Sequence, residues 1–276
     1  MLLAAAALAS AAAAVSPPAR VASLNLTADE VLIEILPASR LAAVTSFADQ
    51  QGTSNIVGRV PPGVTRFPKA DLERVLSFAP DLVVVSEYTD ADFLHQLGTL
   101  GVRSHRMVGL RSLAGIRAAV LDLGRAVGAP AGAARLVERY DEILKELERR
   151  LAGAGRPRVL YWSGALTAGR DTAIGALIEA AGAVNVGSEL GLDGFAPIGA
   201  ERAFLADPDV ILIGTWPGVL ESLRSDPLLS QARAVREGRI VQMPTELLVT
   251  LSHHAARAAW WLGWALHPDR IPRPGP

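Results

Sequence analysis

The sequence contains no cysteine, and this absence excludes disulfide bonds, cysteine-ligated zinc, thiol catalysis and lipid attachment through a cysteine. Aromatic residues make up only 5% of the chain, and the formal net charge of -1 provides no basic surface for nucleic acid. Half of the 276 residues are apolar, which is typical of a packed globular protein. This length is enough for two lobes, each with a core of its own.

Sequence signatures of common enzymes are missing as well. The chain has no G-x-S-x-G elbow, no phosphate-binding loop with its lysine, no H-E-x-x-H pair and no dinucleotide fingerprint after its first strand. Its histidines show no metal-ligand spacing, although His253 and His254 are adjacent. Neighbouring residues on a helix point about 100° apart and rarely bind one ion together. We therefore expect no catalytic residue, no metal site and no cofactor of the protein's own.

Residues 1–19 differ from the rest of the chain. Met1 to Val15 is almost unbroken Ala and Leu, and it is too short for a membrane-spanning helix, which needs about 20 residues. Its small residues fit a secretory signal peptide, with a buried Ala-rich helix as the alternative. No Lys or Arg precedes the apolar run, which leaves open a start further upstream. No later stretch is long and apolar enough to cross a membrane, so we expect a soluble, exported protein.

After the signal segment, apolar runs alternate with helical patterns. Short strands are predicted at 21–26, 41–44 and 82–85, and helices at 28–36 and 91–100. Such alternation indicates a parallel sheet covered by helices.

The middle of the chain predicts a long helix. Residues 131–152 contain no proline, and their apolar positions recur every three or four residues. About 22 residues form a rod of roughly 33 Å, long enough to cross from one lobe to another. The strand–helix alternation resumes at 159–162. These patterns divide the chain into an N-terminal α/β lobe (20–129), a linker helix (130–154) and a C-terminal α/β lobe (155–276).

An internal repeat supports two related lobes. Residues 67–88 and 195–216 share five identities at a constant offset, each at the same place in a helix–turn–strand unit. An aromatic residue follows the strand in each copy, Tyr88 in the first and Trp216 in the second. The identical pairs are Phe67/Phe195, Glu73/Glu201, Arg74/Arg202, Pro80/Pro208 and Asp81/Asp209.

Ligand-binding residues are expected in a cleft between the lobes, because α/β proteins bind ligands beyond the carboxyl ends of parallel strands. Aromatic residues at strand ends either offer flat apolar faces to a large planar or macrocyclic ligand or seal the tops of the lobes. The candidates are Asn25, Thr27, Phe47 and Tyr88 in the first lobe and Trp162, Arg170, Phe195, Trp216, Ser252 and His253 in the second.

Three further tryptophans are expected to pack rather than bind. Trp260, Trp261 and Trp264 fall in a predicted helix with Ser252 as its N-cap, and a spacing of four residues places side chains on one face. His253 would lie in the first turn of this helix, at the mouth of the cleft.

Glu73 and Glu201 occupy matching sites at the starts of two predicted helices. An acidic residue there stabilises the helix dipole by about 0.3–1 kcal/mol. Alternatively, one exposed carboxylate per lobe could meet a basic patch on each half of a dimeric partner, since a pseudo-symmetric protein can dock on a symmetric one.

Taken with the two-lobe pattern and the paired glutamates, three stretches carry a resemblance to a known family. SLNLTADE (23–30), DLERVLSFAPDLVVV (71–85) and AERAFLADPDVILI (200–213) resemble the type III periplasmic binding proteins of bacterial ABC importers, and GRIVQM (238–243) fits their last strand. The resemblance implies a monomeric periplasmic receptor for cobalamin, a ferric siderophore or haem. It also implies docking of Glu73 and Glu201 on arginines of an ABC permease that works with ATPase subunits.

Two alternatives remain at this point. A receptor for a bare divalent metal such as zinc or manganese would need three or four His, Asp or Glu side chains converging in the cleft. An α/β transferase would need a nucleotide-binding loop and a poised acid or base, and the sequence shows neither. Few Arg residues fall in the cleft loops, so a strongly anionic siderophore is less favoured than a corrinoid, haem or neutral chelate.

Overall fold

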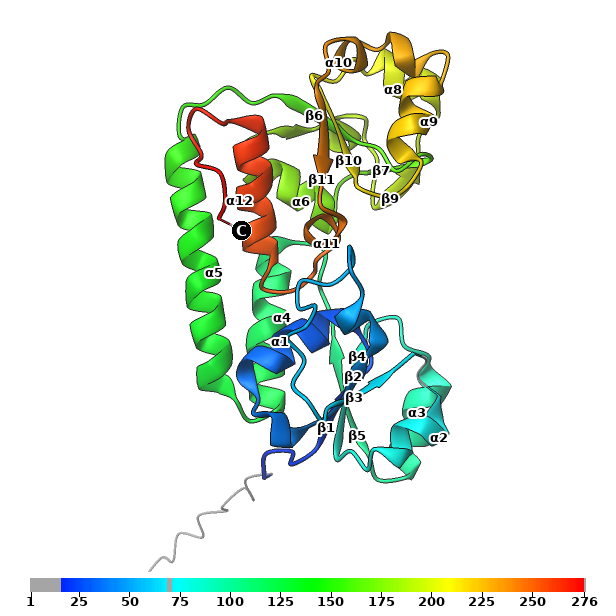
Figure 1. Ribbon diagram of the computed structural model, residues 1–276, viewed down its shortest axis with the longest axis vertical. Helices are drawn as coiled ribbons and strands as arrows, with labels where there is room; N and C mark the ends of the chain where they lie inside the picture. The colour runs from blue at the N-terminus through cyan, green and yellow to red at the C-terminus, as the bar shows by residue number, and fades with distance from the viewer. Residues whose placement is uncertain (1–15, 69–70, 276) are drawn as a thin grey trace, which may run out of the picture.

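The computed structural model describes residues 16–68 and 71–275, so most of the expected signal segment lies outside the described residues. Figure 1 shows two α/β lobes stacked along the long axis, with one long helix beside both. The expected fold class, two parallel-sheet lobes joined by a helix, is confirmed. No helix among the described residues is both long and apolar enough to cross a membrane.

The described residues of the N-terminal lobe form five strands and four helices. They are β1 (Val21–Ser23), α1 (Leu26–Ile35), β2 (Leu41–Thr45), β3 (Thr65–Phe67), α2 (Leu72–Ser77), β4 (Leu82–Ser86), α3 (Ala91–Thr99), β5 (Arg103–Met107) and α4 (Leu113–Ala126), with 3-10 turns η1 (Ala38–Arg40) and η2 (Ser46–Asp49). The sheet order is β3-β2-β1-β4-β5, and all neighbours are parallel.

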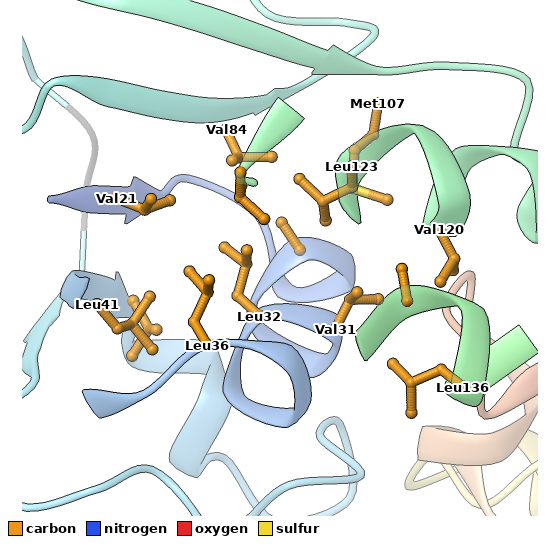
Figure 2. Close-up of a cluster of buried hydrophobic side chains, with 14 of the residues drawn as sticks. Val21, Val31, Leu32, Leu36, Leu41, Val84, Met107, Val120, Leu123 and Leu136 are labelled. Atoms are coloured by element: carbon orange, nitrogen blue, oxygen red, sulfur yellow. The ribbon is translucent and has the colours of Figure 1, made fainter. Parts of the chain in front are cut away.

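Helices cover both faces of this sheet. Leu32 of α1 and Leu123 of α4 pack with Val84 on one face (Figure 2), whereas Val75 of α2 and Leu97 of α3 pack on the other. Burial on both faces explains why β4 reads as an unbroken apolar run.

The first strand is shorter than predicted. β1 ends at Ser23, and α1 begins at Leu26 instead of Ala28 because Asn25 acts as its N-cap. The Asn25 Oδ1 accepts a hydrogen bond from the Ala28 N–H at 2.9 Å, which satisfies one of the free donors of the first turn.

The long helix α5 (Pro130–Leu151) packs on both lobes. Leu136 and Val137 near its start belong to the N-terminal core, and Tyr140 and Leu147 further along belong to the C-terminal core. Proline suits the first position of a helix because the N–H that it lacks has no partner there. One element therefore joins the two cores, as Figure 1 shows on the left.

The C-terminal lobe repeats the architecture with more, shorter elements. They are β6 (Arg158–Tyr161), β7 (Leu166–Ala168), α6 (Ala173–Ala180), β8 (Val184–Asn185), α7 (Val186–Glu189), β9 (Phe195–Pro197), α8 (Ala200–Leu205), β10 (Val210–Gly214), α9 (Val219–Ser225), the 3-10 turn η3 (Leu229–Gln231), α10 (Arg233–Arg236), β11 (Ile240–Met243), α11 (Thr245–Leu248) and α12 (Ala255–Leu266). A parallel sheet has the order β11-β10-β6-β8, and β7 and β9 form a separate antiparallel pair.

The internal repeat has a common structural device in both lobes. Asp81 accepts a hydrogen bond from the backbone N–H of Arg20 at 3.0 Å, and Asp209 accepts one from that of Arg158 at 2.8 Å. The residues two positions earlier, Ala79 and Asp207, both have positive φ, 47° and 40°.

The two arginines complete this device. The guanidinium of Arg20 donates to the Phe78 and Ala79 carbonyls, and that of Arg158 donates to the Ala206 and Asp207 carbonyls. Each arginine thus holds the left-handed turn that leads from a helix into an inner strand of its lobe, β4 or β10. Arg20 and Arg158 do not correspond at the constant offset that relates residues 67–88 to residues 195–216, so the sequence repeat does not pair them.

Candidate functional site

A cleft of about 600 Å³ lies between the two lobes. Its volume falls within the range of about 300–1,000 Å³ that is usual for small-molecule sites. The lining is mostly apolar, and both lobes contribute to it. It comprises Asn25, Thr27, Ser86, Glu87, Tyr88, Leu110 and Arg111 from the N-terminal lobe and Asp171, Thr172, Ala173, Ile174, Gly194, Phe195, Leu248, Val249 and Leu251 from the C-terminal lobe.

Two aromatic side chains from opposite lobes are exposed in this cleft. Tyr88 follows β4 and is 77% exposed, and Phe195 begins β9 and is 54% exposed. The Phe195 ring meets the buried Tyr161 ring edge-on at 6.4 Å between centroids, which fixes its orientation. The cleft therefore offers one apolar ring from each side to a ligand.

One ion pair crosses the cleft between the lobes. The Arg111 Nη1 lies 3.4 Å from the Asp171 Oδ2. Both side chains are more than half exposed, so the pair contributes little to stability. Asp171 has a φ of 59°, a left-handed conformation that costs energy for a residue other than glycine. With Glu87, the ionisable lining carries one positive and two negative charges.

A larger hollow of about 830 Å³ lies at the other end of the C-terminal sheet. The first residues of β10 and β11 line it, together with residues that follow α5 and α12. Two of the charged groups on its wall are already paired, since Asp209 binds Arg233 at 2.9 Å and Arg239 binds Glu237 at 3.0 Å. Of these two hollows, the inter-lobe cleft is the one that lies beyond the carboxyl ends of strands, where α/β sheets bind ligands.

Comparison with known proteins identifies the family of the chain. A family model described as periplasmic binding protein matches residues 21–247, most of the chain. The chain belongs to the periplasmic binding protein family.

Among relatives of this periplasmic binding protein is a cobalamin-binding protein of Halobacterium salinarum, 26% identical over 245 residues. That match covers 86% of this chain but only 65% of the longer relative. Similar solved structures include the apo haem-binding protein RhuT from Roseiflexus sp. RS-1, with a TM-score of 0.75, 23% identity and coverage of 91% and 98% of the two chains. A periplasmic binding protein from Veillonella parvula has a TM-score of 0.79 at 19% identity, covering 92% of each chain. These structures share the fold.

The periplasmic binding protein brings four of the sequence-predicted ligand residues into its cleft. Asn25, Thr27, Tyr88 and Phe195 all line it. The Asn25 Nδ2 is buried without a partner among the described residues, although its Oδ1 caps α1. Most buried polar groups have a partner, so this amide donor stands out among the residues of the cleft lining.

Three aromatic candidates lie elsewhere. Trp162 is 6% exposed and belongs to the core cluster beside Leu160, because alternate residues along a strand share a face. Trp216 is half-buried, packs against the C-terminal core and covers Gly214. Phe47 is 49% exposed in η2, outside the cleft lining. The surroundings of the two tryptophans fit the alternative that they seal the tops of the lobes better than they fit ligand contact.

Arg170 lies beside the cleft rather than in its wall. Its guanidinium binds both carboxylate oxygens of Asp193, at 2.8 and 3.2 Å. Arg170 lines a smaller neighbouring pocket of about 200 Å³, which shares Arg111, Asp171 and Thr172 with the cleft. Its charge is thus already neutralised by a close partner.

The prediction that Ser252 caps the tryptophan helix is wrong. α12 begins at Ala255, and its N-cap position is His254, which provides no side-chain cap. The Ser252 hydroxyl, which is fully buried, instead donates to the Glu30 carboxylate of the N-terminal lobe.

His253 and His254 precede α12 and form no part of the cleft wall. Their rings lie 4.1 Å apart between centroids, so they stack instead of diverging. Burial lowers the pKa of His253 to about 4 and that of His254 to about 2, so both are neutral at pH 7. In the part of the chain that the structure describes, no three His, Asp or Glu side chains gather as metal ligands would.

Sequence reasoning missed several lining residues. Leu110 and Arg111 follow β5, whose sequence RSHRM lacks the apolar run by which the other strands are recognised. Asp171 precedes Thr172, the N-cap of α6, in a segment after the short strand β7. The available signal was the N-cap pattern at Ser112 and Thr172, because helix starts at this sheet edge face the cleft.

Glu73 and Glu201 lie at matching places outside the cleft. Each is exposed and sits in the first turn of its helix, α2 or α8. Figure 1 shows α2 and α8 on the side of the molecule opposite α5, one helix per lobe.

Proposed function

We propose that this protein is the substrate-binding component of an ABC importer and that it captures a metal-containing tetrapyrrole of the corrinoid class in the periplasm. The cleft with one exposed aromatic ring from each lobe carries this proposal. Opposed apolar rings suit a large, flat macrocycle, because they bury its faces and leave its edge to polar groups. Membership of the family and the cobalamin-binding relative support the same assignment.

The charge of the cleft favours a corrinoid over haem. One of its charged side chains is basic, and this residue, Arg111, is already paired with Asp171. Haem carries propionate groups and ferric siderophores are often anionic, so both would leave negative charge beside Glu87 and Asp171. A corrin ring carries mostly neutral amides, which need hydrogen-bond partners such as Asn25 and Thr27 instead of charge compensation.

The test is a titration of the purified protein with cyanocobalamin and, separately, with hemin. We expect cyanocobalamin to bind more tightly, and Tyr88→Ala and Phe195→Ala each to weaken binding at least about fivefold, since a stacked aromatic contributes roughly 1 kcal/mol. Phe47→Ala is the matched control, because Phe47 is a similarly exposed phenylalanine outside the cleft lining. Tighter binding of hemin would reverse the charge argument, and binding of neither would remove the proposed ligand class.

We further propose that the loaded protein docks on a dimeric permease through Glu73 and Glu201 and carries out no catalysis itself. The exposure of both carboxylates and their matched positions support docking. An acidic residue on each lobe can meet equivalent basic groups on the two halves of a symmetric partner.

A further inference from the structure

One buried carboxylate holds the two lobes together at the cleft. Glu30 lies in α1 of the N-terminal lobe and is only 2% exposed. Its Oε1 accepts hydrogen bonds from Asn55 of the same lobe, from the backbone N–H at 3.0 Å and from the side-chain Nδ2 at 2.9 Å. This half of the carboxylate is therefore fixed within its own lobe.

The other oxygen of Glu30 is bound by the C-terminal lobe. Its Oε2 accepts from the Thr250 hydroxyl at 3.2 Å and from the Ser252 hydroxyl. The Asn55 Nδ2 adds a bond to the Glu246 carbonyl at 2.8 Å. We call these residues, Glu30, Asn55, Thr250 and Ser252, the Glu30 junction. It connects α1 with a segment more than two hundred positions later in the chain.

The segment held by this junction forms one wall of the cleft. Leu248, Val249 and Leu251 line the cleft, and Thr250 and Ser252 alternate with them. On the other side of the junction, Asn25, the N-cap of α1, and Thr27 in its first turn also line the cleft. The same carboxylate thus fixes two walls that belong to different lobes.

We propose that Glu30 is a positioning residue that sets the angle between the lobes and so pre-forms the ligand cleft. A buried carboxylate that lost its hydrogen-bond donors would be costly, so the closed junction resists separation of the lobes. The inference rests on the proposed function only in taking the cleft as the ligand site. The effect of Glu30 on the arrangement of the lobes does not depend on the ligand.

The neighbouring Asp29 provides a matched control. It is equally buried, but its Oδ2 accepts from the backbone N–H and the hydroxyl of Thr45, within the N-terminal lobe. Asp29→Ala therefore removes a buried carboxylate from the same helix without touching the contact between the lobes.

The distance between the lobes is the primary measurement. Because the chain has no cysteine, spin labels can be attached at Gln96→Cys in α3 and Ser222→Cys in α9, both exposed positions. We expect one narrow distance distribution for the parent and a clearly broadened or longer one for Glu30→Ala. Glu30→Gln should retain the narrow distribution, since an amide can accept from Asn55 and donate to the Ser252 and Thr250 hydroxyl oxygens.

Two outcomes would overturn the proposal. One is an unchanged distribution in Glu30→Ala, and the other is equal broadening in Asp29→Ala, which would indicate a loss of N-terminal stability only. If Glu30→Ala does not fold, the double variant Thr250→Ala/Ser252→Ala opens the junction from the other lobe and should give the same broadening. A narrow distance distribution in that variant would equally refute the proposal that the Glu30 junction sets the angle between the lobes.

Ligand binding is the second measurement, with cyanocobalamin and hemin as probes. Opening the junction should lower the affinity for the probe that binds at least about fivefold, mainly through faster dissociation. The affinity of Glu30→Gln should stay within about twofold of the parent. If the parent protein binds neither probe, the proposed function fails while the label distances still decide the role of Glu30. Unchanged affinity in a variant whose lobes have separated would show that the junction does not shape the site.

Discussion

At the scale of single residues, two adjacent carboxyl groups in α1 are buried with different partners. Glu30 is bound by both lobes, whereas Asp29 is bound by Thr45 of its own lobe and has one oxygen without a partner among the described residues. Burial raises the pKa of both groups above the ordinary value. A carboxyl group with few donors is easier to bury in its protonated form.

The Asp29 carboxyl group predicts a pH dependence of stability. Burial raises its pKa from 3.8 to about 7, so between these values the folded chain holds a proton that the unfolded chain has released. The free energy of unfolding should therefore fall as pH rises from about 4 to about 7, by up to about 1.4 kcal/mol per pH unit from this group. Asp29→Asn removes this contribution. The free energy of unfolding of the variant, relative to that of the parent, should therefore rise across that range and then level off.

Urea unfolding of the parent and of Asp29→Asn at pH values from 4.5 to 8 measures this difference. His253 and His254 act in the opposite direction, since their lowered pKa values cost stability below about pH 6.5, but they do so in both proteins. The difference between the two curves isolates Asp29. Parallel curves would show that its carboxyl group titrates normally.

At the scale of elements, the outcome of prediction depended on burial. β2, β4, α3 and α5 were predicted within one or two residues, because strands buried on both faces and amphipathic helices have distinctive apolar patterns. The edge strand β5 has no such pattern, since it pairs only with β4 and most of its side chains are exposed or half-buried. The loop after it was missed for the same reason, and with it Arg111.

The candidate site was predictable only in part. Asn25, Thr27, Tyr88 and Phe195 were found because cleft residues follow strand ends, but that rule does not give the direction of a side chain. Trp162 continues the strand ladder by donating its backbone N–H to the Leu212 carbonyl at 2.9 Å, and its ring points into the core. The Glu30–Ser252 contact depends on how the lobes meet, which no local pattern encodes.

The contact of α4 with α5 gives a prediction about packing. A Cβ at Gly124 would lie 2.2 Å from the Ala133 Cβ, so the two helices approach as closely as they do only because Gly124 has no side chain. Gly124→Ala should push α4 away from the first half of α5 and lower the free energy of unfolding by about 1–3 kcal/mol.

Gly98→Ala in α3 is the control for this substitution. A Cβ at Gly98 would meet nothing within 4 Å, and the residue is exposed in a helix. Replacing glycine there should raise stability by about 0.4–1 kcal/mol through the unfolded state. Thermal or urea unfolding of both variants measures the contrast. Equal effects of the two substitutions would contradict the role of Gly124 in helix packing.

At the scale of the whole molecule, the two lobes are similar in construction but differ in what they present. Both use an Arg–Asp device to hold the turn before an inner strand, with Arg20 and Asp81 before β4 in one lobe and Arg158 and Asp209 before β10 in the other. On the outer side, the similarity extends to the helices that carry Glu73 and Glu201. In the cleft it is lost, because Phe67 is buried against Phe78 whereas its repeat partner Phe195 is exposed.

This contrast predicts separate effects of mutation on transport and on binding. If the paired outer carboxylates serve a two-fold permease, Glu73→Lys/Glu201→Lys should abolish uptake by the reconstituted importer, because each exposed positive charge would then face basic groups. Affinity for the ligand should stay within about twofold, since neither residue lines the cleft. Uptake by the reconstituted importer and calorimetric affinity measure the two effects.

The control is Glu142→Lys/Glu148→Lys on α5, which changes the net charge equally at exposed positions on the opposite side. Loss of uptake in the control would indicate a general effect of net charge, and normal uptake in the Glu73/Glu201 variant would exclude docking through these residues.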